Sequence, residues 1–204
     1  MAMNQDKTSS YNAPGNDPFK MFDEWYKEMA TNPSGDSSAM ILSTAASDGA
    51  VSSRVVLLKE IDKKGFLFFT NYNSRKSAQI GSNHNASLLF YWPNQKRQVR
   101  IEGVVEKISD ELSDRYFLSR PIDSRLGAWA SEQSTEIESM KVVEERFRLY
   151  KEKFGSTIPR PEYWGGYRLI PSMFEFWQEG DHRLHHRTVL QKKGGGWKIS
   201  FLAP

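Results

Sequence analysis

Hydrophobic and polar residues alternate in short runs between residues 39 and 108, and each run ends in residues that favour turns. Five runs have the pattern of β-strands: AMILSTAA, VSSRVVLLK, FLFFTN, ASLLFYW and RQVRIEGVVEKI. Asp48-Gly49 separates the first two runs, and a turn-prone stretch from Asp62 to Gly65 separates the second from the third. The pattern predicts an antiparallel meander in which RVVLLK and FLFFTN form a hairpin.

The segment that begins at Asp17 has the periodicity of an amphipathic helix. Asp17 is a favoured N-cap residue, and Pro18 suits the first helical position, where an amide hydrogen would have no intrahelical partner. Four apolar residues then recur at helical spacing: Phe19, Phe22, Tyr26 and Met29. Residues 1–16 are polar and lack periodicity, so we expect a mobile arm followed by one domain over residues 17–204.

A short helix is predicted at SRKSAQIGSN, where the Ser74 hydroxyl can cap the first amide groups. Arg75 and Lys76 stand in its first turn, where the helix dipole disfavours positive charge unless an anion binds. Taken alone, the two residues are more simply interpreted as solvated surface cations. Arg54 and Lys59 favour a binding site instead, because they bring the number of cations around the predicted hairpin to four. This grouping predicts an anion site.

Strand geometry separates two of these cations. Successive side chains of a strand point to opposite faces. The faces carry Arg54, Val56 and Leu58 on one side and Val55, Leu57 and Lys59 on the other. Arg54 and Lys59 can therefore bind the same atoms only if a bulge intervenes. Two anions, or one ligand that wraps around the strand end, satisfy both cations. In RQVRIEGVVEKI, the alternation predicts a half-buried strand, and Gln98 on its polar face could donate to a ligand carbonyl.

Residues 109–155 are predicted to be helical, with Ser109 or Asp110 as a cap, a break at Pro121 and an end at Gly155. An apolar stripe near the end is typical of core packing: Val143, Phe147, Tyr150 and Phe154. Between the helices, SRPIDSRLGAWASEQS mixes hydroxyl and guanidinium groups around proline and glycine. That mixture suits a phosphate-binding loop and an ordinary polar loop equally well.

The last section returns to strands: GYRLIPSMFEFWQ, HRLHHRTVLQ and WKISFLAP. The Gly194–Gly196 stretch is predicted to be a hairpin loop, since no helix follows it as in a nucleotide-binding fingerprint. The apolar residues of the final strand predict that it docks into the body of the fold: Trp197, Ile199, Phe201 and Leu202. His182, His185 and His186 raise a zinc hypothesis, which strand-like surroundings and the lack of acidic partners beyond Asp181 disfavour.

Composition limits the classes of function. The 204 residues suffice for one domain with a substantial core, and 28 basic residues opposed by 25 acidic ones give a net charge of only +3, which disfavours nucleic-acid binding. The absence of cysteine excludes disulfides and thiolate chemistry, so redox chemistry requires a cofactor. No bilayer-length apolar run and no signal-peptide pattern occur, and we expect a soluble cytoplasmic protein with no membrane partner.

Several blocks in order make the chain similar to the pyridoxamine 5′-phosphate oxidase family, also called the pyridoxine 5′-phosphate oxidase family. The blocks are RVVLLK, FFTNYNSRK, LLFYW with RQVRIEG, SDRYFLSRPIDSRLGAWASEQS, PRPEYWGGYR, EFWQ, RLH followed by HR, and the terminal LAP. They extend from about Asp17 to Pro204. The resemblance implies a mainly β fold with flanking helices, an antiparallel FMN-binding split β-barrel of Greek-key type, with FMN at the interface of a homodimer.

The resemblance also implies roles for particular residues. The FMN-binding positions match Arg54, Val55, Val56, Leu57, Leu58, Lys59, Phe69, Thr70, Arg75, Lys76, Gln98, Gln133, Ser134, Trp177 and Arg187. The positions that hold the substrate phosphate match Lys59, Tyr116, Arg120 and Ser124. A further segment flanks the reacting carbon, with Arg183 and His185 as the catalytic pair: Arg183, Leu184 and His185.

The implied reaction moves a hydride from C4′ of pyridoxamine or pyridoxine 5′-phosphate to flavin N5, giving pyridoxal 5′-phosphate, with O₂ as acceptor and H₂O₂ released. Three positions depart from the family pattern: His186 replaces Asp, Glu179 replaces Gly and Phe201 replaces Arg. The arm also lacks the usual arginine-and-tyrosine pattern, apart from Tyr11. These departures raise the alternative of an impaired flavin- or pyridoxal-phosphate-binding protein. A nicotinamide-dependent flavin reductase is disfavoured by the substrate-phosphate block.

Overall fold

The computed structural model describes residues 15–31 and 35–204, so most of the predicted arm, including Tyr11, lies outside the described residues. Its strands are β1 (Ala39–Ala45), β2 (Val51–Leu57), β3 (Glu60–Ile61), β4 (Phe66–Asn71), β5 (Asn85–Trp92), β6 (Arg97–Lys107), β7 (Trp164–Gln178), β8 (His186–Lys193) and β9 (Gly196–Leu202). Its helices are α1 (Pro18–Thr31), α2 (Arg75–Ser82), α3 (Asp110–Ser119), α4 (Ile122–Ala130), α5 (Met140–Phe154) and the 3₁₀ turn η1 (Asp181–Arg183).

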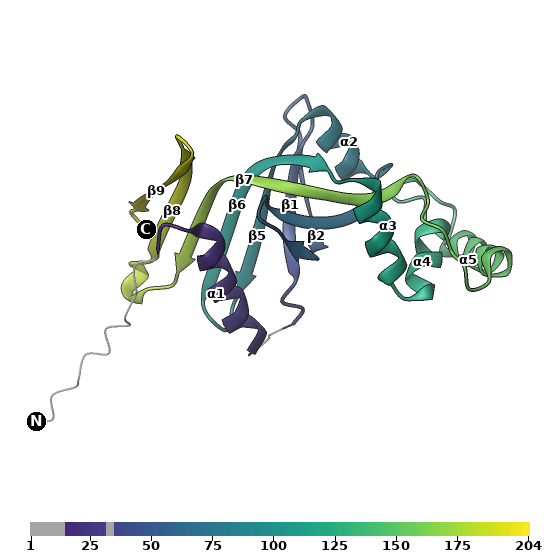
Figure 1. Cartoon of the computed structure of the whole chain (residues 1–204), viewed down its shortest axis with the longest axis horizontal. Coiled ribbons are helices and arrows are strands. Elements are labelled where there is room, and N and C mark those ends of the chain that lie inside the picture. The colour runs from purple at the N-terminus through teal and green to yellow at the C-terminus, as the bar shows by residue number, and fades with distance from the viewer. Residues whose placement is uncertain (1–14, 32–34) are drawn as a thin grey trace, which may run out of the picture.

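The strands form one curled antiparallel sheet in the order β2-β1-β5-β6-β7-β4-β3, and β8 and β9 extend it from β7 (Figure 1). The long β7 pairs with β6 along most of its length, with β4 through its first part and with β8 through its last part. This arrangement is the mainly β, split-barrel type of fold with flanking helices that the sequence predicts. Figure 1 shows α3, α4 and α5 at one end of the molecule and the β8–β9 hairpin at the other.

The predicted meander is wrong in one respect, because β2 and β4 do not form a hairpin. β2 pairs with β1, and the turn from Asp62 to Gly65 joins β4 to the short β3 instead. The chain changes partner between the two strands, where the Leu58 amide donates to Ser38 (2.8 Å) and the Lys59 amide donates to Leu67 (2.9 Å). Because β2 and β3 lie at opposite edges of the sheet but are consecutive in the chain, this change draws the two edges together.

The core fills the curl of the sheet with aromatic side chains, and α1 covers it. Phe22 of α1 is fully buried and makes edge-to-face contacts with Phe66 and Phe90, whose ring centroids lie 5.0 and 4.9 Å away. The Asp17 carboxylate accepts from the Phe19 and Lys20 amides, which confirms the predicted cap. The alternation in β6 is also confirmed, since its Val99 and Ile101 side chains are buried and its polar positions are not.

The caps of α2 and α3 and the segment after Pro121 test the predictions for the helices. The Ser74 hydroxyl does not cap α2, because it donates to the Asn71 carbonyl instead (2.7 Å). The Ser109 hydroxyl does cap α3, accepting from the Leu112 amide. The polar segment after Pro121 is helix α4 rather than a loop. α4 forms because its apolar side, around Leu126, packs in a second buried cluster with Phe117 of α3.

The structure confirms the predicted turn of the C-terminal hairpin but only part of the predicted docking of its last strand. Gly194 and Gly195 have φ values of 57° and 86°, which glycine adopts without strain, and they form the predicted turn between β8 and β9. β9 pairs only with β8 among the described strands. Trp197 packs against the core, whereas Phe201 is 65% exposed and lies outside it. Docking of the last strand into the fold is therefore wrong for its final residues.

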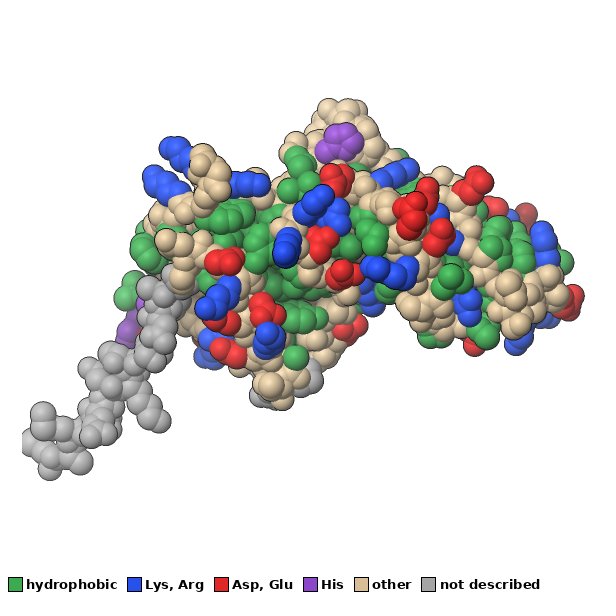
Figure 2. Space-filling view, viewed as in Figure 1, with side chains coloured by type: hydrophobic (Ala, Val, Ile, Leu, Met, Phe, Trp, Pro, Cys, Tyr) green, Lys and Arg blue, Asp and Glu red, His purple; other side chains and the backbone are tan. Residues whose placement is uncertain are grey.

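On the face drawn in Figure 2, acidic and basic side chains are interspersed over the body of the molecule. Across residues 15–31 and 35–204, every helix is too short or too polar to cross a bilayer. The predicted strand around His182 is replaced by η1, where His182 and Arg183 have φ values of 54° and 66°.

Candidate active site

A pocket of about 1060 Å³ opens between β2, β4, α2, the end of α3 and α4. It brings together most of the residues that the sequence predicts for binding a cofactor and a substrate. These are Arg54, Val55, Val56, Leu57, Lys59, Phe69, Thr70, Arg75, Lys76, Tyr116, Arg120, Ser124, Gln133 and Ser134. Leu58 is the exception on the RVVLLK run, because its side chain is buried in the core cluster.

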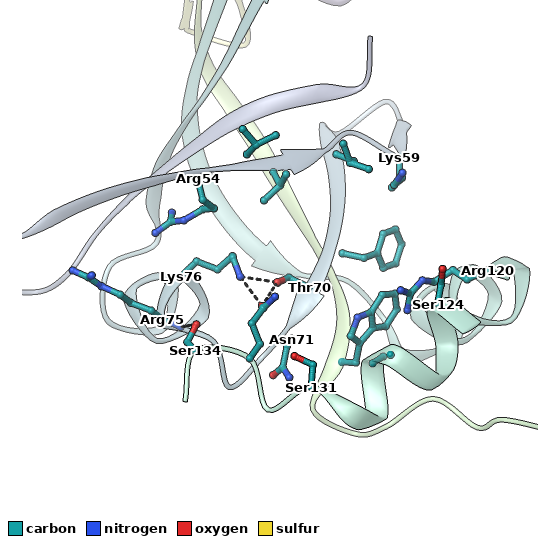
Figure 3. Close-up of a pocket in the computed structure, with 18 of the residues that line it drawn as sticks. Arg54, Lys59, Thr70, Asn71, Arg75, Lys76, Arg120, Ser124, Ser131 and Ser134 are labelled. Atoms are coloured by element: carbon teal, nitrogen blue, oxygen red, sulfur yellow. Dashed lines mark hydrogen bonds between the residues drawn. The ribbon is translucent and has the colours of Figure 1, made fainter. Parts of the chain in front are cut away.

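The pocket has two cationic ends, shown in Figure 3. Arg54, Arg75 and Lys76 lie at one end. Lys59 and Arg120 lie toward the other, together with Ser124. Arg54 and Lys59 therefore lie apart in the pocket (Figure 3), but strand alternation is not the reason, because β2 ends at Leu57 and the Lys59 amide donates to Leu67 of β4. We call these two groups the α2 end and the α3–α4 end of the pocket.

Lys76 is the most buried cation of the α2 end. Its ammonium donates to Gln133 Oε1 (2.7 Å) and to the hydroxyls of Thr70 and Ser74 (both 3.0 Å). Burial, with a further contribution from Arg54, lowers the pKa of Lys76 to about 8. Neutral oxygens thus hold the ammonium in place without balancing its charge, which suits a site that binds an anion.

The loop that follows α4 completes this end of the pocket. It supplies Gln133 to Lys76, and its Ser134 hydroxyl accepts from the Arg75 amide at the start of α2 (3.3 Å). Ser134 has a φ of 73°, an uncommon backbone conformation for a residue other than glycine. The first turn of α2, which carries two cations, therefore faces a loop of short polar side chains.

Aromatic rings line the α3–α4 end. The ring of Tyr116 stacks on that of Phe69 with centroids 3.9 Å apart, and the Trp164 ring stacks with both, at 5.6 Å from Phe69 and 6.2 Å from Tyr116. The Arg120 guanidinium lies 4.6 Å from the Trp164 ring, and its buried Nη1 has no hydrogen-bond partner among the described residues. Burial lowers the pKa of Arg120 and raises that of Tyr116. A buried N–H without an acceptor costs free energy, and an anionic ligand bound at this end would supply the acceptor.

Sequence reasoning missed several residues of the pocket, of which Trp164 is the most prominent. Its signal was the PRPEYWGGYR block, in which two glycines follow the tryptophan. A β-carbon at Gly165 would lie 2.2 Å from the Tyr72 hydroxyl oxygen, so this stretch requires close backbone packing. The other missed pocket residues are small or lie beside predicted ones: Ser52, Ser53, Asn71, Pro121, Gly127, Ala128 and Ser131.

The remaining predicted residues lie outside this pocket. Gln98, Trp177 and Arg187 occupy the face of β6, β7 and β8 that points away from the core, which we call the outer face together with Arg100 and Glu175. Glu175 is only 3% exposed and accepts from Arg187 Nε (2.7 Å) and from Arg100. These two hydrogen bonds outweigh burial and hold the pKa of Glu175 below its usual value.

The predicted catalytic segment follows the outer face along the chain. Arg183 ends η1, Leu184 is 65% exposed, and the His185 ring lies 4.8 Å from that of Trp177. This segment stands beside β8, at the end of the molecule away from α3 and α4 (Figure 1). One chain therefore does not bring Arg183, Leu184 and His185 to the pocket. Among the described residues, no three His, Asp or Glu side chains gather in a way that could hold a metal ion.

Comparison with known proteins places both parts of the chain in one family. Residues 27–153 match the family model described as "Pyridoxamine 5′-phosphate oxidase", and residues 164–204 match "Pyridoxine 5′-phosphate oxidase C-terminal dimerisation region". A pyridoxine/pyridoxamine 5′-phosphate oxidase of Cupriavidus taiwanensis is 50% identical over 189 residues, covering 92% of this chain and 89% of that protein. The same name and identity apply to a relative from Burkholderia multivorans over 191 residues, with the same coverage.

Solved structures agree on the fold. PhzG from Burkholderia lata, in complex with tetrahydrophenazine-1-carboxylic acid, is 30% identical with a TM-score of 0.91, covering 96% of both chains. A pyridoxamine 5′-phosphate oxidase-related, FMN-binding protein from Nostoc punctiforme has a TM-score of 0.74 at 15% identity, covering 94% of this chain and all of that one. The dimerisation region that ends the chain supports a homodimer. On the match to residues 27–153 and the 50% identity to its relatives, the chain belongs to the pyridoxamine 5′-phosphate oxidase family.

Proposed function

We propose that this protein is an FMN-dependent oxidase that converts pyridoxamine 5′-phosphate and pyridoxine 5′-phosphate to pyridoxal 5′-phosphate. The observation that carries the proposal is the pocket with two separate cationic ends. FMN and the substrate each bring one phosphate, and each phosphate is close to doubly charged at neutral pH. A pocket for both molecules needs two groups of cations at a distance, which the α2 end and the α3–α4 end provide.

FMN is the cofactor that family membership implies, and the residues present fit it. The α2 end offers Arg54, Arg75 and Lys76 to a phosphate, with the Ser134 hydroxyl beside them. None of these three cations forms an ion pair with a carboxylate among the described residues. Val55, Val56 and Leu57 of β2 line the space between the two ends and give an apolar wall to a flat ring. FMN, when bound, supplies the hydride acceptor that the twenty amino acids lack.

The substrate phosphate belongs at the α3–α4 end in this proposal. Arg120 and Lys59 offer charge, and Tyr116 and Ser124 offer hydroxyl donors. The Trp164 and Phe69 rings fix the direction of the Arg120 side chain and of Tyr116. Holding the phosphate here places the pyridine ring toward the middle of the pocket, where its C4′ can meet the flavin.

Arg183 and His185 reach this site from a second protomer. Within one chain they lie beyond β8, away from the pocket, together with Gln98, Trp177 and Arg187 on the outer face. The match to a dimerisation region covers residues 164–204, a range that contains four of these five residues. A twofold arrangement that sets the outer face of one protomer over the pocket of its partner completes the set of residues that the family resemblance implies.

The balanced reaction takes two electrons and two protons from the substrate and gives them to O₂ as H₂O₂, with ammonia also released from the amine substrate by water. Arg183 orients the substrate over the ring, and His185 hydrogen-bonds it or assists the transfer of a proton. The surrounding rings and the second protomer exclude bulk water from the reacting carbon. Neither residue needs to act as an obligatory acid or base. The cytoplasmic location stays a prediction from the sequence.

Two other functions remain to be distinguished. The likeness to PhzG suggests oxidation of a tricyclic carboxylic acid, but such a molecule has no phosphate to meet Arg120 and Lys59 together. The second alternative is an impaired flavin- or pyridoxal-phosphate-binding protein, which His186 and Phe201 raise. Phe201 is exposed on β9, and His186 begins β8 next to the catalytic segment.

An aerobic assay with each compound separates these functions. The purified protein should be yellow, and pyridoxamine or pyridoxine 5′-phosphate should release peroxide while tetrahydrophenazine-1-carboxylic acid releases little. The flavin spectrum is recorded in the same sample, so cofactor loss is not mistaken for inactivity. Bound flavin without turnover of either phosphate would support the impaired protein. Preferential turnover of the tricyclic acid would instead assign the chain a PhzG-like reaction.

A further inference from the structure

Gln79, on the inner side of α2, forms a hydrogen-bonded junction behind the α2 end of the pocket. It is 5% exposed and does not line the pocket itself. Its Oε1 accepts from the Thr44 hydroxyl (2.6 Å) and the Ser52 hydroxyl (2.7 Å), and it lies 3.4 Å from an Nη of Arg54. Three segments of the chain, β1, β2 and α2, therefore meet at one amide oxygen.

The direction of each hydrogen bond in this junction is fixed by chemistry. Arg54 only donates, and it donates to the Thr44 hydroxyl (2.7 Å), to the Ser52 hydroxyl and to the Leu42 carbonyl (3.1 Å). A hydroxyl that accepts from Arg54 must send its one hydrogen elsewhere. Gln79 Oε1 takes both of those hydrogens, which keeps the hydroxyl lone pairs turned toward the guanidinium.

The orientation of the Gln79 amide is also fixed. Its Nε2 donates to the Ala50 carbonyl (3.3 Å), so the oxygen end and not the nitrogen end faces Arg54. The junction contains no acid, and Arg54 forms no ion pair among the described residues. Glu175 holds Arg187 on the outer face with a carboxylate, whereas Gln79 holds Arg54 with a neutral amide.

We propose that Gln79 is a positioning residue that fixes Arg54 through two hydroxyls while leaving its positive charge available to the phosphate of FMN. This inference rests on the proposed function, which assigns the α2 end to that phosphate. A carboxylate at the same place would accept the same hydrogen bonds and would also neutralise Arg54. The neutral amide separates the two tasks, since it orients the cation without competing with the ligand.

The exchange of Gln79→Glu tests this separation, because it preserves the shape and adds one negative charge. Apo-protein is titrated with FMN and with riboflavin, which lacks the phosphate, by quenching of flavin fluorescence. Thermal unfolding of the same apo-protein is followed in parallel. We expect FMN to bind about tenfold or more weakly, since a charge-assisted contact is lost, with riboflavin affinity unchanged and Tm unchanged or higher.

Gln178→Glu is the matched control. Gln178 also accepts from an arginine through its Oε1, from Arg97 Nε at 2.6 Å, but lies outside the pocket. This control should bind FMN like the wild type. If Gln79→Glu does not fold, Gln79→Met decides the question, because loss of the acceptor should also lower FMN affinity relative to riboflavin.

The outcomes separate the inference from the function on which it rests. Wild-type selectivity for FMN over riboflavin that survives both Gln79 substitutions would overturn the inference alone. An equal loss of FMN and riboflavin affinity together with a lower Tm would also overturn it, because Gln79 would then serve only stability. Equal binding of FMN and riboflavin by the wild-type protein would overturn the assignment of the α2 end to the phosphate, and this inference with it.

Discussion

The pocket and the outer face both present arginines, but they treat the charge differently. Arg54 and Arg120 in the pocket contact hydroxyls, carbonyls and an aromatic ring, and neither meets a carboxylate among the described residues. Arg187 and Arg100 on the outer face are both held by the buried Glu175. Elsewhere, Arg160 and Arg168 each bridge two acids.

The difference separates cations that are available to bind an anionic ligand from cations that already pair with a carboxylate of the protein. An uncompensated buried cation is costly in the empty protein, and binding of a dianion recovers that cost. A cation clamped by a carboxylate is fixed in direction and contributes donors more than net charge. The pocket is therefore suited to attract phosphates. In the proposed function, the outer face presents rigid donors to the flavin bound in the pocket of a second protomer.

The largest expected effect comes from testing whether the pocket of one protomer and the outer face of its partner together form one active site. Chains with Arg120→Ala and chains with Arg183→Ala should each form nearly inactive homodimers. Their mixed dimers contain one intact site, so co-expression should restore about a quarter of wild-type activity, because half of the dimers are mixed. Two affinity tags verify the mixed species. Pure mixed dimers without activity would show that the sites do not combine in this way.

Arg120→Ala alone tests the α3–α4 end of the pocket. Removal of the Arg120 guanidinium from this end should raise KM for pyridoxamine 5′-phosphate on the order of a hundredfold, with FMN retained. Steady-state kinetics and the flavin spectrum measure the two effects in one preparation. Arg125→Ala on the neighbouring helix is the control, since Arg125 does not line the pocket. Loss of FMN in place of a KM effect would mean that the two ends are misassigned.

Glu175→Gln tests the clamp on the outer face. The buried hydrogen bonds to Arg187 and Arg100 weaken, so unfolding free energy should fall by about 1 to 3 kcal/mol and FMN affinity by roughly tenfold. Glu102→Gln is the control, because Glu102 binds Arg100 without contacting Arg187. Denaturant titration and flavin titration give the two numbers. FMN affinity that falls equally in both variants would argue against a specific role for the Arg187 clamp.

Lys76 should make FMN binding depend on pH. Its pKa in the apo-protein is lowered from the usual 10.5 to about 8, so the ammonium is progressively lost above pH 8. FMN affinity should therefore fall several-fold between about pH 7 and 9.5, since a bound dianion favours the charged form. Lys76→Arg, which stays charged, should flatten this profile. The same lowered pKa means that the apo-protein gains stability from this group as pH rises between 8 and 10.5.

His186→Asp is expected to have the smallest effect. His186 begins β8 at a distance from the pocket of its own chain, and the substitution restores the family residue without altering either cationic end. We expect kcat to change by less than about threefold, because Arg183 and His185 are retained and neither cationic end of the pocket is altered. Stopped-flow reduction of the flavin by pyridoxamine 5′-phosphate measures it. A large gain would favour the impaired-protein alternative.

The sequence anticipated much of the pocket because its signals are local. Cations at the ends of RVVLLK and in the first turn of α2 were recognisable from spacing. The alternation argument for Arg54 and Lys59 was wrong in its cause, because β2 ends at Leu57. The signal for Trp164, a tryptophan followed by two glycines, was less specific, because such a block fits many roles. Gln79 and Glu175 were missed because their importance lies in hydrogen bonds to residues far away in the chain, such as Ser52 and Arg187.

Local sequence patterns were enough to predict most of the strands, the helix at Asp17, the two groups of cations and the family resemblance. Alternation, helical period and turn residues act over a few positions, so they survive without knowledge of the fold. Only the tertiary structure decided that β4 pairs with β7, that the stretch after Pro121 is a helix, and that the catalytic segment lies away from the pocket. These outcomes depend on which apolar faces are buried together and on how the sheet edges meet. Both are determined by contacts between parts of the chain that are far apart in sequence.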